Sequence, residues 1–163
     1  LHAVVEDART AAEDHLLIFK RDEKGELKRS ERYGSYELEN QYYNYDSAGG
    51  IIYEVDVSRP VGERIRIISL ADCTAFDMGK KYKAAINSYR GTGGGGHLTI
   101  GAGIPTQELS QRLLDSTTKD LRYFIMKWIE EKKTITPTAS GNWKAVPGEW
   151  WKKAKDKDYK LLY

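Results

Sequence analysis

The sequence has little of what builds disulfide-rich, metal-centred or membrane-spanning proteins. Cys73 is the only cysteine among the 163 residues, which excludes an intramolecular disulfide and any cysteine-rich metal site. No apolar run reaches the roughly 18 residues that a transmembrane helix needs, so neither a transmembrane helix nor a signal peptide is expected in these residues. The net charge of +2 argues against general nucleic-acid binding, and the 40% hydrophobic and 31% charged fractions are typical of a globular protein.

Catalytic motifs are also missing. The histidines His2, His15 and His97 stand apart, and none has the H-x-E, D-x-H or H-E-x-x-H spacing that gathers metal ligands. The glycine-rich stretch after residue 90 has no lysine where a P-loop needs one. It is followed by no clear helix, and no βαβ unit surrounds it, so a Rossmann fingerprint is excluded too. The residues alone therefore predict a binding surface and no catalytic centre.

The length of 163 residues predicts one domain with a real hydrophobic core. The chain opens LHAVVEDART without an initiator methionine, which indicates a part excised from a larger protein. Basic residues gather toward the C-terminus, where residues 119–160 hold eleven Lys or Arg against six acids. We interpret this region as a solvated face, with steering of phosphates as the alternative.

Hydrophobic periodicity predicts an α+β fold with a mainly antiparallel sheet, hairpins and packed helices. An amphipathic helix is expected over residues 1–16, followed by a strand at 16–19, a turn at 22–25 and a second, charged strand. Alternation then predicts strands at 51–57 and 63–70, joined as a hairpin by a turn at 59–62. The predicted order then continues with a connection over 71–79, a strand over 82–89, two helices and a short strand at 134–137.

The two predicted helices carry different signals. Pro105 fits the first turn of the earlier helix, and Thr117 and Asp120 have the spacing of a capping box at the start of the later one. The apolar positions of the earlier helix are Leu109, Leu113 and Leu114. Those of the later helix have the spacing of a buried stripe: Leu121, Phe124, Ile125, Trp128 and Ile129.

The C-terminal tail mixes tryptophan with lysine. Pro147 and Gly148 are expected to break any long amphipathic helix there, which argues against a membrane-surface segment. Packing of Trp143, Trp150 and Trp151 onto the domain is the interpretation we favour.

The most informative stretch is 82–103, YKAAINSYRGTGGGGHLTIGAG. Its first part ends in Asn87, Tyr89 and Arg90, and five glycines follow within residues 91–97. Glycine costs extra entropy on folding, so this loop indicates that backbone approaches something closely or adopts positive φ. A flat, polar ligand is therefore expected to meet the main chain there. His97 is either a ligand contact or a hydrogen-bonding support of the loop.

A second cluster of aromatic residues lies at 33–46, which holds five tyrosines. Tyrosine is enriched where one edge of the ring is buried and the other is wet, and packing on a β-surface explains most of these residues. Tyr45 differs because it lies just before the small-residue loop 47–50. It is the tyrosine of this cluster that we expect to line a site.

Three segments resemble the C-terminal domain of the bacterial 5′-nucleotidase family: GGIIYEVDVSRPVGERI, YKAAINSYRGTGGGGH and the apolar helix that follows. The resemblance runs from about residue 14 to residue 163 and is nearest to the 2′,3′-cyclic-nucleotide 2′-phosphodiesterase/3′-nucleotidase branch. It implies a layered α/β/β/α domain that binds the nucleoside of a nucleotide. It also implies that a separate N-terminal metallophosphoesterase domain, with two divalent metal ions, performs hydrolysis at a periplasmic or cell-surface location.

The resemblance further implies which residues bind the substrate. In the family two aromatic rings sandwich the base, and the matching positions here are Tyr45, ahead of Gly49 and Gly50, and Tyr89, which follows Asn87. Stacking a base on an aromatic ring is worth roughly 1–3 kcal/mol. Arg90 is the candidate for charge near the phosphate. Main-chain groups of the loop are candidates for approach to the ribose: Gly93, Gly94, Gly95 and Gly96.

This sequence departs from the family pattern in several places. The aspartate of the usual Gly-Gly-Asp-Gly loop is Gly95 here, which favours a cyclic or 3′-nucleotide as substrate. Cys73 stands where a turn glycine is commoner. The opening G-G-x-R segment, with its phosphate-contacting arginine, and every metal-binding motif are missing.

We therefore expect residues 1–163 to be an N-terminally truncated substrate-binding domain, without the catalytic metal site and inactive alone. Its expected partners are a nucleotide or nucleoside and the intramolecular metallophosphoesterase domain, but no nucleic-acid duplex. The competing hypothesis is a non-catalytic module that uses the same tyrosine-and-glycine surface for a sugar or cell-wall component. A purely structural role is the third.

Overall fold

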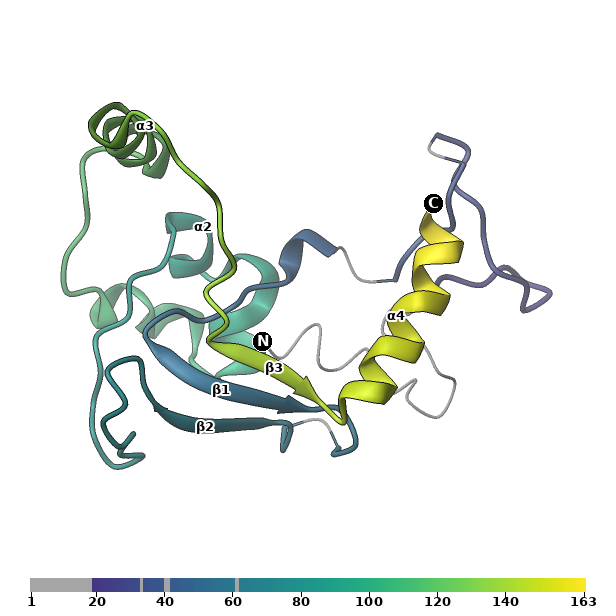
Figure 1. Ribbon diagram of the computed structural model, residues 1–163, viewed down its shortest axis with the longest axis horizontal. Coiled ribbons are helices and arrows are strands. Elements are labelled where there is room, and N and C mark those ends of the chain that lie inside the picture. Colours follow the sequence, from purple (N-terminus) through teal and green to yellow (C-terminus); the bar gives the residue numbers. More distant parts are fainter. Residues whose placement is uncertain (1–18, 33, 40–41, 61) are drawn as a thin grey trace. The chain divides into compact units, whose positions relative to one another are not determined.

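The computed structural model describes residues 19–32, 34–39, 42–60 and 62–163 (Figure 1). The chain divides into two compact units, which we describe separately. Unit 1 consists of the described residues up to Lys80 together with Gly141–Tyr163, and unit 2 is Lys81–Ser140. The helix predicted over 1–16 and most of the strand predicted at 16–19 lie outside the described residues.

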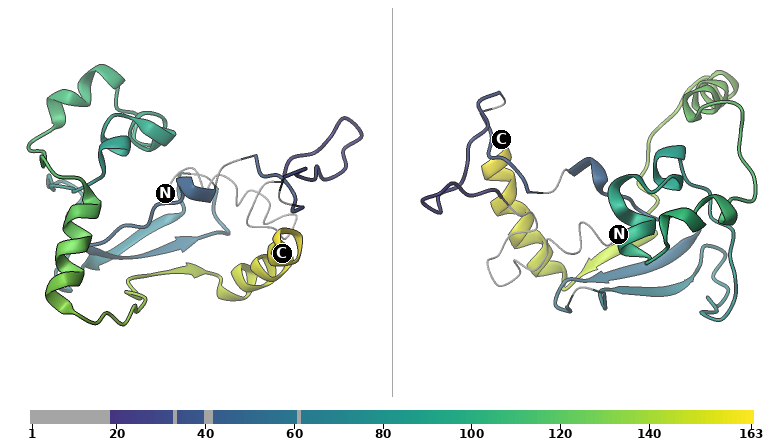
Figure 2. Two further views of the ribbon diagram at one scale, coloured as in Figure 1. Left: turned by 90° about the horizontal axis from the view of Figure 1, so that it is seen from above. Right: turned by 180° about the vertical axis from the view of Figure 1, so that it is seen from behind.

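Unit 1 is built on a three-stranded mixed sheet with the order β2-β1-β3, whose strands lie side by side in both views of Figure 2. β1 (Ile51–Asp56) pairs antiparallel with β2 (Ile65–Leu70) and parallel with β3 (Trp143–Val146). The predicted hairpin is confirmed, and Gly62 in its turn has a φ of +92°. The α+β class is confirmed as well. β3 was not predicted, because four residues are too short for alternation to show.

The core of unit 1 lies on one face of β1. Tyr53, Val55 and Val57 are buried there, and alternate residues of a strand point to the same face. The opposite face carries Glu54, which pairs with Arg66 of β2 and with Lys144 of β3 at 3.1 Å. Hydrogen bonds from these two cations hold the pKa of Glu54 below its ordinary value of 4.5. The apolar face stabilises unit 1 by burial, and the polar face joins all three strands through one carboxylate.

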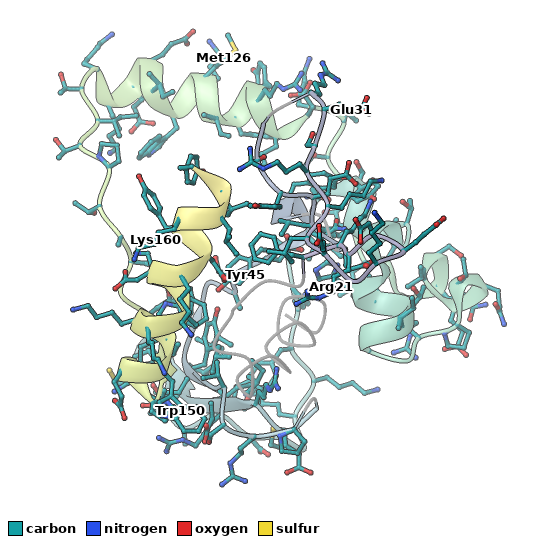
Figure 3. All side chains as sticks on the ribbon, turned by 90° about the vertical axis from the view of Figure 1, so that its right-hand side faces the viewer. Arg21, Glu31, Tyr45, Met126, Trp150 and Lys160 are labelled. Atoms are coloured by element: carbon teal, nitrogen blue, oxygen red, sulfur yellow. The ribbon has the colours of Figure 1, made fainter. Side chains whose placement is uncertain are left out.

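Helix α4 (Gly148–Leu162) follows β3 directly, with Pro147 as its N-cap. The expectation that Pro147 and Gly148 would break a helix is wrong, because they start one. The first N–H groups of a helix have no intrahelical partner, so proline is tolerated there. Trp143 and Trp151 pack onto the core, with their rings edge-to-face at 6.2 Å, as predicted. Trp150 does not, since 47% of it is exposed (Figure 3).

The described N-terminal part of unit 1 is a hairpin (19–29) whose arms also bridge to residues 36–38. Its isolated antiparallel bridges join Phe19 with Leu38, Arg21 with Leu27, and Arg29 with Tyr36. Asp22 organises its tip, because its Oδ1 accepts the backbone N–H groups of both Lys24 and Glu26 at 2.9 Å. The turn predicted at 22–25 is confirmed. A short 3-10 turn, η2 (Tyr42–Asn44), lies between this hairpin and β1.

Unit 2, all of whose residues are described, contains helices and turns but no strand. Its elements are α2 (Ser88–Gly91), η3 (Gly94–Gly96), η4 (His97–Gly101), η5 (Thr106–Glu108), η6 (Ser110–Arg112) and α3 (Leu121–Lys132). The strands predicted over 82–89 and 134–137 are therefore wrong. Apolar runs this short form strands only when a neighbouring strand completes the ladder. The helix expected after Pro105 is two separate 3-10 turns, in which Leu109 is buried and Leu113 and Leu114 are exposed.

Helix α3 is confirmed, but its predicted cap is not. Asp120 is the N-cap residue itself, since its Oδ1 accepts the backbone N–H of Tyr123 at 3.1 Å. The hydroxyl of Thr117 donates instead to the carbonyl of Lys119. Asp120 therefore caps the helix alone, without the reciprocal arrangement of a capping box.

The apolar stripe of α3 is exposed, which contradicts the prediction that it is buried. Its members are between 44% and 65% exposed: Leu121, Phe124, Ile125, Trp128 and Ile129. Met126, on the same helix, is exposed as well (Figure 3). Helical spacing predicts which residues share a face, but it does not say what covers that face. Among the described residues, no helix combines the length and the apolarity that crossing a membrane requires.

Candidate functional site

The predicted site residues fall into both units. Tyr45 belongs to unit 1. Eight others follow one another through α2, η3 and η4 of unit 2: Asn87, Tyr89, Arg90, Gly93, Gly94, Gly95, Gly96 and His97. The structure thus brings together the whole glycine-loop part of the predicted site, and it places the other ring in a separate aromatic cluster.

Asn87 fixes the start of the segment that carries Tyr89 and the glycine loop. Its backbone is extended, with φ −73° and ψ 161°, and its Oδ1 accepts the backbone N–H of Arg90 at 2.8 Å. This is an N-cap, and it starts α2 at the next residue. The hydroxyl of Thr92 closes the other end of the turn by donating to the carbonyls of Ser88 and Tyr89. The carboxamide oxygen of Asn87 is therefore engaged in fixing the turn that carries Tyr89.

Tyr89 presents its ring from this turn. The residue is 58% exposed, yet its ring lies against the main chain of Gly94. A Cβ atom at position 94 would come within 2.5 Å of Tyr89 Cε2 and 2.6 Å of Tyr89 Cδ2. The close approach that the sequence led us to expect is thus realised inside the protein, between a glycine and an aromatic ring.

Arg90 supports the same pair. It is buried at 7% exposure, and its Nη1 donates to the carbonyl of Gly94 at 3.2 Å. Its guanidinium carbon also lies 5.3 Å from the centroid of the Tyr89 ring, within the range of a cation–π contact. One side chain therefore links the glycine loop to the ring that rests on it.

The glycine loop has the positive φ angles that its composition indicated, with +96° at Gly93, +73° at Gly95 and +74° at Gly96. It is not an open loop, however. It winds through η3 directly into η4, so the expectation that no helix follows the glycines is wrong. The left-handed glycines reverse the chain between short helical turns, which other residues do only with strain.

His97 stands at the junction of η3 and η4. Both nitrogens of its ring are shielded from solvent, and its carbonyl accepts the N–H of Ala102 at 3.0 Å. Of the two roles left open by the sequence, this burial favours support of the loop over contact with a ligand.

Tyr45 lies in the aromatic cluster of unit 1, where it is half-buried (Figure 3). Its ring centroid is 5.9 Å from that of Trp143, with the planes tilted by 45°, and Trp143 in turn stacks on Tyr53. Burial, together with the neighbouring Tyr53 phenol, raises the pKa of Tyr45 to about 12. Tyr45 is therefore a neutral ring supported by tryptophan.

The loop that follows Tyr45 is fastened by a residue that the sequence did not point to. Nδ2 of Asn142 donates to the carbonyls of Ala48 at 2.7 Å and Ile51 at 2.8 Å. The N–H of Ala48 donates to the Tyr53 hydroxyl at 3.2 Å. No local pattern could have revealed Asn142, because its partners lie more than 90 residues earlier in the chain.

Metal binding finds no support in the described part of the chain. No group of three or more His, Cys, Asp or Glu side chains there could hold a metal ion. These residues do not fit a metal centre, and we derive no metal-dependent step from them.

Comparison with known proteins gives two matches. The model of the family described as 5′-nucleotidase, C-terminal domain, matches residues 6–101. The trifunctional nucleotide phosphoesterase protein YfkN of Bacillus subtilis (strain 168) is 30% identical over 118 residues, which cover 64% of this chain. The aligned part is 7% of that relative, so the chain spans only a small share of its length. No solved structure matches.

Proposed function

The chain belongs to the 5′-nucleotidase C-terminal domain family, and on this premise we propose that it binds the nucleoside part of a nucleotide for a metal-dependent phosphohydrolase. The observation that carries the proposal is the ring of Tyr89. It is 58% exposed but held in place by Gly94 and Arg90. A ring that is ordered before the ligand arrives loses little entropy when a base stacks on it.

Tyr45 is the second ring of the proposal. Its contact with Trp143 supports it in the same way that Gly94 supports Tyr89. Each of these rings can stack on any base, because stacking uses the π-face that all bases share. The main chain of Gly93 to Gly96 is proposed to approach the ribose. The absence of an aspartate at Gly95 favours a cyclic or 3′-nucleotide.

Hydrolysis is assigned to another part of the parent protein. We propose an N-terminal metallophosphoesterase domain with two divalent metal ions, to which this domain presents the substrate. The relative named as a nucleotide phosphoesterase, of which this chain matches 7%, supports such a division. A periplasmic or cell-surface location belongs to the same proposal and rests on the family alone.

Titration of the 163-residue chain with adenosine and with 3′-AMP, followed by calorimetry, tests the proposal. Weak binding is expected, and Tyr89→Ala should reduce the affinity about tenfold, in line with the energy of one stacked base. Tyr123→Ala is the matched control, because Tyr123 is an exposed tyrosine of the same unit. The absence of binding to the folded chain at millimolar ligand, or equal losses in both variants, would refute the base-binding role.

A second assay tests whether hydrolysis requires a part of the parent protein outside this chain. The chain alone should not release phosphate from 3′-AMP or from a 2′,3′-cyclic nucleotide when Mn²⁺ or Zn²⁺ is added. Phosphatase activity that copurifies with the chain through several steps would place the catalytic centre here instead.

A further inference from the structure

We propose that Asn142 is a positioning residue for Tyr45, and that the segment 141–146 thereby completes the base-binding surface of unit 1. The inference rests on the proposed function. Asn142 and Trp143 lie beyond residues 6–101, which the family model matches. The segment that contains them is brought to Tyr45 by β3, which pairs parallel with β1.

The hydrogen bonds of Asn142 span the loop that follows Tyr45. Its Nδ2 donates to the carbonyls of Ala48 and Ile51, which lie on either side of Gly49 and Gly50. Its own carbonyl accepts the N–H of Tyr53 at 3.0 Å. A primary amide supplies two N–H donors from one nitrogen, so one side chain can hold both ends of the turn.

Trp143 acts on the ring itself. It is the next residue after Asn142, and Tyr53 is its Cα partner across the β1–β3 pair. Its indole stacks on Tyr53 with 14° between the planes, and its ring centroid lies 5.9 Å from that of Tyr45. Asn142 therefore holds the loop while Trp143 holds the ring, and both depend on the same strand.

The anchor matters because the loop after Tyr45 is Ser-Ala-Gly-Gly, whose glycines have wide conformational freedom. Without Asn142, the loop and Tyr45 would sample many positions, and binding would have to order them. Loss of the anchor should therefore reduce ligand affinity even though Asn142 does not touch the ligand.

The first test measures adenosine affinity by calorimetry in the 163-residue chain. Asn142→Asp keeps the shape but replaces both donors with acceptors that face two carbonyls, and Asn142→Ala removes the group. Both should weaken binding by about fivefold or more, a part of what one stacked ring contributes. Asp22→Ala is the control, because it removes a side-chain anchor of the same unit whose partners, Lys24 and Glu26, lie in the N-terminal hairpin. It should leave the affinity within about twofold.

A double-mutant cycle separates positioning from a general structural role. If Asn142 acts through Tyr45, Asn142→Ala should have no further effect on affinity in a Tyr45→Ala background. Additive losses would overturn the proposal. Equal affinity of the wild-type chain and the Asn142→Asp variant for adenosine would also overturn it.

A measurement on the ligand-free chain tests the anchoring by Asn142 separately from the proposed base binding. The indole N–H signal of Trp143 in an NMR spectrum, assigned with Trp143→Phe, senses the ring of Tyr45 beside it. Tyr45→Leu should shift this signal, and Asn142→Asp and Asn142→Ala should shift it in the same direction. An unshifted signal in the Asn142 variants would overturn the anchor. A wild-type chain without adenosine binding would instead overturn the base-binding role, whatever the signal shows.

Discussion

The ring of Tyr89 and the main chain of Gly94 occupy adjoining space that no side chain at position 94 could share. A Cβ atom there would also come within 2.6 Å of the carbonyl oxygen of Tyr89, so the conflict involves backbone as well as ring. The glycine and the tyrosine are therefore parts of one structure. At this position, the glycine content of the loop is explained by packing within the protein, and the proposed ligand would meet a surface that is already formed.

Gly94→Ala should displace the Tyr89 ring and strain the turn. Inserting a methyl group into a site without room costs typically 1–3 kcal/mol of stability, and the affinity for adenosine should fall as well. Urea unfolding and calorimetry measure the two effects. Gly148→Ala is the matched control, since a Cβ there meets nothing within 4 Å and should leave both quantities nearly unchanged. Equal behaviour of the two variants would contradict the close approach.

Arg90→Lys should weaken adenosine and 3′-AMP by the same factor. The guanidinium is buried against Gly94 and Tyr89, and lysine cannot reproduce its planar fork of donors. A buried hydrogen bond from a charged group is worth about 1.5–3 kcal/mol, so stability should fall too. Arg112→Lys, at an exposed arginine paired with Glu108, is the control. A loss confined to 3′-AMP would instead place Arg90 at the phosphate, as the family resemblance suggests.

Much of unit 1 could be predicted from the sequence because its pattern is local. Alternation in residues 51–57 and 63–70 predicted the β1–β2 hairpin of unit 1. In unit 2, likewise, the glycine content of residues 91–97 predicted positive φ angles. β3 and Asn142 could not be predicted, since both depend on pairing across more than 80 residues. The strand predicted over 82–89 failed for the opposite reason: a single Asn87 side chain caps a four-residue helix, and this local bond outweighs a short apolar run.

At the apolar stripe of α3, the burial predicted from the sequence pattern and the exposure in the structure lead to different expected stabilities. A buried stripe would make Ile125→Ala costly, at about 2–5 kcal/mol. Ile125 is 46% exposed, so we expect a change in the free energy of unfolding of about 0.5 kcal/mol or less. Val55→Ala, in the core of unit 1, should cost more than Ile125→Ala in the same urea titration. A larger cost at Ile125 would mean that the stripe is covered in solution.

The cap of α3 can be tested with two neighbouring substitutions. Asp120→Ala removes the oxygen that accepts the N–H of Tyr123 and should cost about 0.5–2 kcal/mol. Thr117→Ala removes only a hydroxyl that donates to a carbonyl in the preceding turn, so its effect should be much smaller. Circular dichroism during urea unfolding measures both. A larger effect at Thr117 would restore the capping box that the sequence indicated.

The aromatic cluster of unit 1 should leave a signature at alkaline pH. Burial raises the pKa of Tyr45 from 10.0 to about 12, so the folded state disfavours its phenolate. The stability that the neutral phenol contributes is therefore fully present below pH 10 and is lost as the pH rises through about 12. The difference between tyrosinate absorbance titrations of the wild type and Tyr45→Phe isolates this one group. It should show a transition centred near 12 in the folded chain and near 10 in urea. A transition near 10 in the folded chain would mean that Tyr45 is solvated, and that Trp143 does not support its ring.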